Sequence, residues 1–224
     1  MTSRYAQLAF TTNVQRHQQQ HGSERAYRRF AQGLAVPDPI GDDERLFISL
    51  RDSFYMATVS ETGWPYIQHR GGPRGFLRVL DEHTLGFADF RGNRQYITRG
   101  NLDHDNRVSL FLMDYANQFR LKIFGRATAV EAQDDPELVA KLTVKDYRAK
   151  VERALVIDVE AYDWNCHQHI PQLLHADDVE QAVGSLHERI ATLESALATR
   201  GEPTSADTVS HARPGGATGS AGPK

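Results

Sequence analysis

The sequence predicts a mainly β fold with flanking helices, in which short antiparallel strands form a barrel or a sandwich. Two observations predict it. From Phe54 onward, short runs rich in β-branched and aromatic residues replace the helical pattern of the preceding segment, and tight turns such as Glu61-Thr62-Gly63 separate them. The chain also has 224 residues, 40% of them hydrophobic, which suits one core of ordinary size with extensions.

Residues 1–41 are expected to form an N-terminal helical extension. Ser23 is a suitable cap for a helix that runs to Leu34, and Pro37-Asp38-Pro39 ends it. Asp42 then opens a short helix that reaches Leu50, because acidic residues stabilise the positive end of a helix.

Residues 42–172 are expected to form the β domain. We predict strands at 54–59, 65–69, 76–80, 84–89, 108–113, 119–130 and 154–162. A loop at 70–75 follows the second strand, and a short helix from Arg94 to Arg99 is expected to end at Gly100. Helices are also predicted at 136–142 and 144–151.

Residues 173–200 are predicted to form an amphipathic helix. Its apolar residues alternate spacings of four and three, as in a heptad repeat: Val179, Val183, Leu186, Ile190, Leu193 and Leu197. Two interpretations are open, because the helix could pack on the barrel or pair across a dimer. Residues 201–224 are rich in Gly, Ser, Thr, Ala and Pro, and we expect a disordered tail.

Composition argues against several classes of protein. The formal net charge is -3, so no overall field attracts nucleic acid or an anionic membrane. No apolar run approaches the ~20 residues that span a bilayer, and the N-terminus lacks the apolar core of a signal peptide. A single cysteine, Cys166, excludes an intrachain disulfide and fits a reducing compartment. We therefore expect a full-length cytoplasmic protein that binds neither nucleic acid nor membranes.

Two loops combine arginine with glycine, at 68–74 and 89–95. A phosphate needs cationic donors and exposed backbone N–H groups, and glycine lets the backbone come close. A helix that starts near Arg94 would direct further N–H groups at an anion. The alternative is that these are solvated arginines in ordinary turns.

The two loops belong to a longer pattern that resembles the pyridoxamine 5'-phosphate oxidase superfamily. Residues 87–95 are similar to its phosphate loop, 106–110 to its Asn-Pro-Arg-Val strand, and 121–127 to a strand that ends in glycine before two small residues. The resemblance covers about residues 42–164 and keeps the order of all three motifs. It implies an FMN-binding split β-barrel that is homodimeric, with the flavin at the subunit interface.

The resemblance also implies roles for single residues. Arg94 matches the phosphate-binding arginine, whereas Gln95 stands where the family usually has lysine and Asn93 where it often has serine. One positive charge is thus missing, and Arg91 or the arginines of the 70–75 loop are expected to replace it. The implied cofactor-binding residues are Gln68, His69, Arg70, Asp89, Phe90, Arg91, Asn93, Arg94, Gln95, Arg120 and Trp164. Of these, Arg120 and Trp164 would reach the flavin from the other subunit.

Three further features allow more than one interpretation. His69 is the candidate acid–base group, because histidine titrates near neutrality, but it could simply be a hydrogen-bonding neighbour. Trp164 could cover the flavin or be a core residue that fixes the C-terminal segment. Cys166, His167 and His169 are poorly spaced for zinc and lack a fourth ligand, so we expect no metal.

The implied function is that of an FMN-dependent oxidoreductase acting on an unidentified small molecule. Genuine pyridoxamine phosphate oxidases need a second phosphate clamp, and neither Lys145, Tyr147 and Arg148 nor His167-Gln168-His169 matches it, so we do not expect vitamin B6 synthesis. The alternative is a non-catalytic flavin-binding protein that stores, senses or carries electrons. Deazaflavin- or haem-binding relatives of the same barrel are a further possibility.

Overall fold

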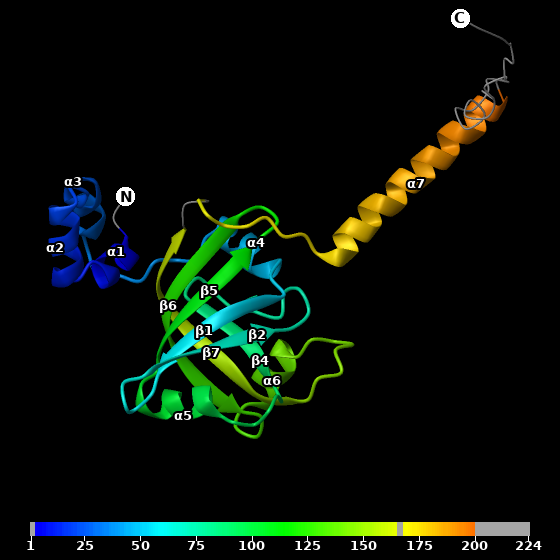
Figure 1. The fold of residues 1–224 in the computed structure, drawn as a ribbon. Coiled ribbons are helices and arrows are strands. Elements are labelled where there is room, and N and C mark those ends of the chain that lie inside the picture. Colours follow the sequence, from blue (N-terminus) through cyan, green and yellow to red (C-terminus); the bar gives the residue numbers. More distant parts are fainter. Residues whose placement is uncertain (1–2, 165–167, 200–224) are drawn as a thin grey trace, which may run out of the picture. The chain divides into compact units, whose positions relative to one another are not determined.

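The computed structural model describes residues 3–164 and 168–199, and the chain divides into two units, Met1–Leu173 and Leu174–Lys224. In the first unit, seven strands form one antiparallel sheet in the order β2-β1-β5-β6-β7-β4-β3 (Figure 1). The strands are β1 (Ser53–Val59), β2 (Pro65–Gly71), β3 (Arg78–Val79), β4 (Thr84–Phe90), β5 (Arg107–Asp114), β6 (Phe119–Glu131) and β7 (Val151–Trp164). The expected mainly β fold with flanking helices is confirmed.

Alternate side chains of the strands form the core, as the period of a half-buried strand requires. In β1, Phe54 and Met56 are almost completely buried, and the neighbouring Tyr55 is 40% exposed. The Phe54 ring stacks on Phe76 at 5.6 Å and meets Phe87 edge-on at 5.3 Å between ring centroids. This aromatic group joins β1 to β4, which lie far apart in the order of the sheet.

The two longest strands, β6 and β7, pair along most of their length, with a shift in register between Phe124 and Gly125. A Cβ atom at Gly125 would lie 2.6 Å from the Asp158 carbonyl oxygen. Only glycine therefore allows the two backbones to approach this closely at the bulge.

The helices are short outside the second unit. They are α1 (Arg4–Ala9), α2 (Thr12–Gln20), α3 (Glu24–Tyr27), η1 (Arg28–Ala31), α4 (Asp42–Ser49), α5 (Ile97–His104), α6 (Pro136–Leu142) and α7 (Ala176–Thr199). Figure 1 shows α4 and α5 at opposite ends of the strands. In the described part of the chain, no helix is both long and apolar enough to cross a membrane.

Several predicted boundaries differ from the structure. The helix expected over 94–99 is α5, which begins at Ile97 and continues through Gly100, because Arg94 and Tyr96 both have left-handed backbones. The helix expected from Ser23 to Leu34 is broken into α3 and η1 and ends at Ala31.

The predicted helix at 144–151 is wrong. Asp146 has a left-handed backbone (φ 65°), which a helix does not tolerate, and residues 147–150 are irregular. The Arg91 N–H donates to the Lys150 carbonyl oxygen at 2.8 Å, so this stretch extends toward β4, and Val151 begins β7.

The sheet curves until its two ends face each other across the site described below. In the described chain, β2 pairs only with β1, and β3 pairs with β4 only at Leu85 and Gly86. Arg70 from β2 nevertheless bonds Asp89 from β4 (Nη1 to Oδ1, 2.6 Å). A side-chain ion pair thus joins β2, at one end of the order, to β4, the last long strand before the other end, where no backbone ladder does. Arg70 was expected in a loop, but β2 continues to Gly71 by pairing with Ser53.

The second unit, in its described part, contains the helix α7. The six heptad residues named above are between 40% and 63% exposed. The predicted disordered tail at 201–224 lies outside the described residues.

Candidate functional site

A small cavity of about 60 Å³ lies where β2, the end of β4 and the start of α5 meet. Seven of the predicted cofactor-binding residues line it: Gln68, Arg70, Asp89, Phe90, Asn93, Arg94 and Gln95. The structure therefore brings the two arginine–glycine segments together at one place.

The alternation of β2 decides which of its residues reach the cavity. Tyr66, Gln68 and Arg70 are half-buried and line it, whereas His69 is exposed. The His69 ring packs edge-on against Tyr55, with 5.6 Å between centroids. Because successive strand residues point to opposite faces, the structure does not bring His69, the candidate acid–base residue, to this cavity.

Asp89 is the centre of the charged groups at the cavity. Its Oδ1 accepts from Arg70 at 2.6 Å and its Oδ2 accepts from Arg153 Nη1 at 3.0 Å. All three side chains are only 11% to 13% exposed. Buried charges need such partners, since an unpaired charge in this environment is strongly unfavourable.

Arg153 extends the network to β6 and α5. Its Nε donates to Glu131 Oε1 at 3.0 Å, and Arg99 Nε lies 3.5 Å from the same oxygen. Burial by itself lowers the pKa of Arg153, but the hydrogen bonds to Glu131 and Asp89 outweigh it, and the pKa is raised. Arg153 therefore stays charged and holds β4, β6 and β7 together.

Glu152 forms an ion pair with Arg91, an arginine of the 89–95 loop. Arg91 Nε donates to Glu152 Oε1 at 2.8 Å, and this bond is the main cause of the lowered pKa of Glu152. The Tyr96 hydroxyl also donates to Glu152, at 3.4 Å. Arg91 is thus beside the cavity but is not one of its lining residues.

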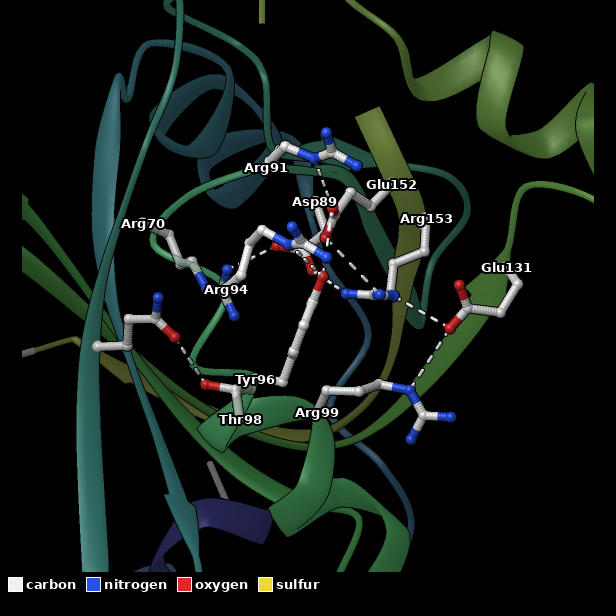
Figure 2. Close-up of polar contacts among 11 residues, drawn as sticks. Arg70, Asp89, Arg91, Arg94, Tyr96, Thr98, Arg99, Glu131, Glu152 and Arg153 are labelled. Carbon is white, nitrogen blue, oxygen red and sulfur yellow. Dashed lines mark hydrogen bonds and ion pairs between the residues drawn. The ribbon is translucent and has the colours of Figure 1, made fainter. Parts of the chain in front are cut away.

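Arg94 differs from the other arginines around the cavity. Its Nε donates to the Tyr96 hydroxyl at 3.3 Å, which raises the pKa of Arg94, and among the described residues it has no ion pair with a carboxylate. Figure 2 shows its guanidinium group beside the network. Together with Arg94, the network has five arginines (Arg70, Arg91, Arg94, Arg99 and Arg153) and four carboxylates (Asp89, Asp103, Glu131 and Glu152), an excess of one positive charge.

Arg70 contributes an unsatisfied donor to the same cavity. Its Nε is buried and has no hydrogen-bond partner in the described chain, although its Nη1 bonds Asp89. A buried donor without a partner costs about 1–3 kcal/mol. A ligand with an acceptor at this position would remove that cost.

The backbone between β4 and α5 is unusual. Arg94 (φ 62°) and Tyr96 (φ 54°) are both left-handed without being glycine, and the Gln95 N–H donates to Asn93 Oδ1 at 3.2 Å. Tyr96 is the N-cap residue of α5, and its side chain makes no capping hydrogen bond. The free N–H groups of its first turn carry partial positive charge, and strained backbone of this kind gathers at functional sites.

Two hydrogen bonds fix α5 against the sheet. Thr98 Oγ1 bonds Gln68 Oε1 at 2.8 Å, and Asn101 Nδ2 donates to Thr58 Oγ1 at 2.9 Å. Thr98, Asn101 and Thr58 are almost completely buried. The start of α5 is therefore held in place on β1 and β2.

Sequence reasoning missed several residues that line this site, among them Tyr96, Thr98, Arg99, Glu152 and Arg153. The available signal was the register of β4 and β7, in which Asp89 pairs with Arg153. The predicted last strand began at residue 154, one position too late to include this arginine. With the preceding segment taken as a helix, the register could not be found.

Arg120 and Trp164 lie at a second cavity of about 430 Å³, which residues of the N-terminal extension also line. Trp164 Nε1 donates to Glu44 Oε1 at 2.7 Å, and its ring packs on Phe47 at 4.8 Å. Trp164 thus has the packing contacts of a core residue. Arg120 Nε is buried without a hydrogen-bond partner in the part of the chain that the structure describes. Within one chain, neither residue lines the first cavity.

The segment that contains Cys166, His167 and His169 is only partly described. Cys166 and His167 lie outside the described residues, and the backbone of His169 is left-handed (φ 64°). Within residues 3–164 and 168–199, no group of three or more His, Cys, Asp or Glu residues could hold a metal ion.

Comparison with known proteins places this geometry in context. A family model described as pyridoxamine 5'-phosphate oxidase matches residues 40–165, more than half of the chain. HupZ of Group A Streptococcus is 18% identical with a TM-score of 0.46, and the match covers 60% of this chain and 99% of that chain. An FMN-binding protein from Syntrophomonas wolfei is 13% identical with a TM-score of 0.42, covering 58% and 84%. General Stress Protein 26 from Bacillus anthracis is 13% identical with a TM-score of 0.41, covering 53% and 88%. No curated protein matches the sequence.

Proposed function

Because the chain belongs to the pyridoxamine 5'-phosphate oxidase family, we propose that the cavity beside Arg94 binds the phosphate of FMN. The observation that carries the proposal is the meeting, at one cavity, of Arg94, which has no ion pair within the described residues, and the start of α5, whose N-cap side chain makes no capping hydrogen bond. Guanidinium and helix N–H donors together form a phosphate site. Gln95, in the place of the family's lysine, gives no charge, and the excess positive charge of the network supplies it.

The residues around the cavity fit the rest of the cofactor. Arg70 Nε, which has no hydrogen-bond partner in the described chain, could donate to a polar atom of the cofactor. Gln68, Asp89 and Phe90 line the cavity beside it. When bound, FMN would supply hydride or electron transfer, which no side chain supplies by itself. The role of Arg70 would be to donate to the cofactor while Asp89 orients its guanidinium group.

We further propose that a second copy of the chain completes the site with Arg120 and Trp164. The buried, unsatisfied Arg120 Nε supports this, because a ligand acceptor would satisfy it. In this arrangement Trp164 would keep its bond to Glu44 and help to hold the flavin. His69 would then be a neighbour rather than an acid–base group.

The proposed activity is FMN-dependent oxidation or reduction of a small molecule other than pyridoxamine phosphate. A non-catalytic flavin-binding protein is the second candidate, and one observation favours it. Both carboxylates that line the cavity are occupied, Asp89 by Arg70 and Arg153, and Glu152 by Arg91. Within the described lining, neither carboxylate is free to move a proton.

Titration with FMN and with riboflavin tests the phosphate assignment, because riboflavin lacks the phosphate. We expect Arg94→Ala to raise the Kd for FMN by roughly 10- to 100-fold, the range for loss of a charge-assisted hydrogen bond, and to leave the Kd for riboflavin unchanged. Arg107→Ala is the matched control, since Arg107 pairs with Asp105 and is 72% exposed. Equal FMN affinity in wild type and Arg94→Ala would place the phosphate elsewhere.

Flavin reduction separates the two candidate functions. With FMN bound, an oxidoreductase should show reduction or reoxidation that saturates with a particular small molecule. A storage or carrier protein should exchange electrons at a rate that no such molecule changes. Stopped-flow absorbance of the bound flavin under anaerobic conditions makes this measurement.

A further inference from the structure

The helix α7 carries an apolar stripe that the described chain leaves exposed. Its heptad residues are 40% to 63% exposed, and none of the described residues of α7 is buried. A helix of about three heptads is only marginally stable when its apolar face meets water. Burial of the stripe against an apolar partner would therefore stabilise α7.

The identities of the heptad residues specify what kind of partner fits. The spacing places Val183 and Ile190 at a positions, and Leu186 and Leu193 at d positions. β-Branched residues at a with leucine at d favour a parallel pair of helices over trimers and tetramers. The two central heptads of α7 thus have the sequence of a parallel two-stranded coiled coil.

The charges beside the stripe specify the orientation. Arg189 is at a g position and Glu194 at the following e position. In parallel helices in register, a g residue meets the e residue five positions further on in the other chain, so Arg189 meets Glu194 twice. Overlapped antiparallel helices would instead place Arg189 opposite Arg189, and Glu180 opposite Glu194. Like charges in both of these contacts disfavour the antiparallel pair.

We propose that α7 pairs with α7 of a second copy of this chain as a parallel, in-register coiled coil. The partner of α7 is a second copy of the chain because the charges of α7 are complementary to those of another α7 in that arrangement. The polar faces agree with this, since Asp177, Gln181 and Glu188 fall at b and f positions and stay in solvent. The proposal stands on α7 alone and does not depend on flavin binding.

Disulfide trapping in the full-length chain tests the orientation, with Cys166→Ser as the background. Val179→Cys places a thiol at a d position near one end of α7, where two parallel helices bring the thiols together. We expect most molecules of this variant to form a covalent dimer under mild oxidation. Gln181→Cys, at an f position on the opposite face, is the matched control and should stay largely monomeric on a non-reducing gel.

Two results would overturn the proposal. Equal trapping of Val179→Cys and Gln181→Cys would mean that the stripe does not pair. Trapping that requires a mixture of Val179→Cys with Leu197→Cys would mean that the helices are antiparallel. All three positions are on the exposed helix, so the substitutions should leave the barrel folded, which far-ultraviolet circular dichroism can check.

A charge exchange tests the register independently. Arg189→Glu places glutamate opposite Glu194, so we expect the trapped fraction of Val179→Cys to fall at least several-fold at low salt. The double exchange Arg189→Glu with Glu194→Arg restores opposite charges and should restore trapping. If the double variant traps no better than the single one, the pairing of these two residues is refuted.

Discussion

Replacing Asp89 by asparagine removes the charge that holds Arg70 and Arg153 but keeps the shape of the side chain. Both arginines are buried, at 13% and 11% exposure, and Asp89 bonds each of them. After the change, Arg153 retains Glu131, whereas Arg70 has no other ion pair within the described residues. One buried guanidinium group is thus left uncompensated.

The loss of stability can be estimated from this one unpaired guanidinium group. Removing one partner of a buried ion pair costs about 3–5 kcal/mol, and the remaining Glu131 contact puts this case near about 3 kcal/mol. In a chain of this size, that corresponds to a fall of about 6–12 °C in Tm. The same change raises the positive excess from one to two (five arginines and three carboxylates), so affinity for inorganic phosphate should rise while stability falls.

Urea unfolding of the flavin-free protein, followed by tryptophan fluorescence, gives the free energy directly. Asp105→Asn is the control, because it removes an Asp–Arg pair whose arginine is 72% exposed, and we expect little change. If Asp89→Asn and Asp105→Asn had the same free energy of unfolding, solvent would be screening the ion pairs of Asp89. The ion pairs of Asp89 would then contribute little to closing the barrel.

Three further predictions concern other positions. Gly125→Ala should lower the free energy of unfolding by about 1–3 kcal/mol, because the new Cβ would clash with the Asp158 carbonyl oxygen; unchanged urea unfolding would refute the tight bulge. Gly184→Ala should stabilise α7 by about 0.5–1 kcal/mol, since no described atom lies within 4 Å of the added methyl group. Circular dichroism during thermal melting measures this stabilisation, and a loss of helix would contradict the prediction. Burial raises the pKa of Tyr162 to about 12, so its contribution to stability is complete below pH 10 and is lost as pH rises to about 12. Tyr162→Phe should therefore flatten the alkaline loss of stability, and an identical pH profile would refute the shift.

The sequence was sufficient for elements whose local pattern and tertiary context agree. Apolar alternation located the strands that frame the core, and acidic residues located the start of α4 at Asp42. The arginine–glycine segments were correctly expected to be near each other, because the resemblance placed both at one site. The sequence did not predict which residues of β2 point toward the cavity. Arg70 was expected in a loop, so its pairing with β1 was not predicted.

The missed features have tertiary causes. Val144, Tyr147 and Val151 have helical spacing, yet the Arg91 backbone bonds this stretch to the edge of β4 and overrides that preference. The left-handed backbones of Arg94 and Tyr96 are unusual for these residue types, so no local signal predicts them. Fold class could thus be predicted from local pattern, whereas the wall of the site contributed by β7 could not.

The closure of the barrel by Arg70 and Asp89 has a mechanical consequence. Elsewhere the sheet resists deformation through rows of backbone hydrogen bonds, but between β2 and β4 the resistance rests on side chains, chiefly this one contact. The boundary between these strands therefore lacks the backbone hydrogen bonds that join the other neighbouring strands, and the cavity lies beside it. A molecule held by both Arg70 and Arg94 would link the two sides of this boundary, so that an occupied site would hold β2 and β4 together more firmly than an empty one.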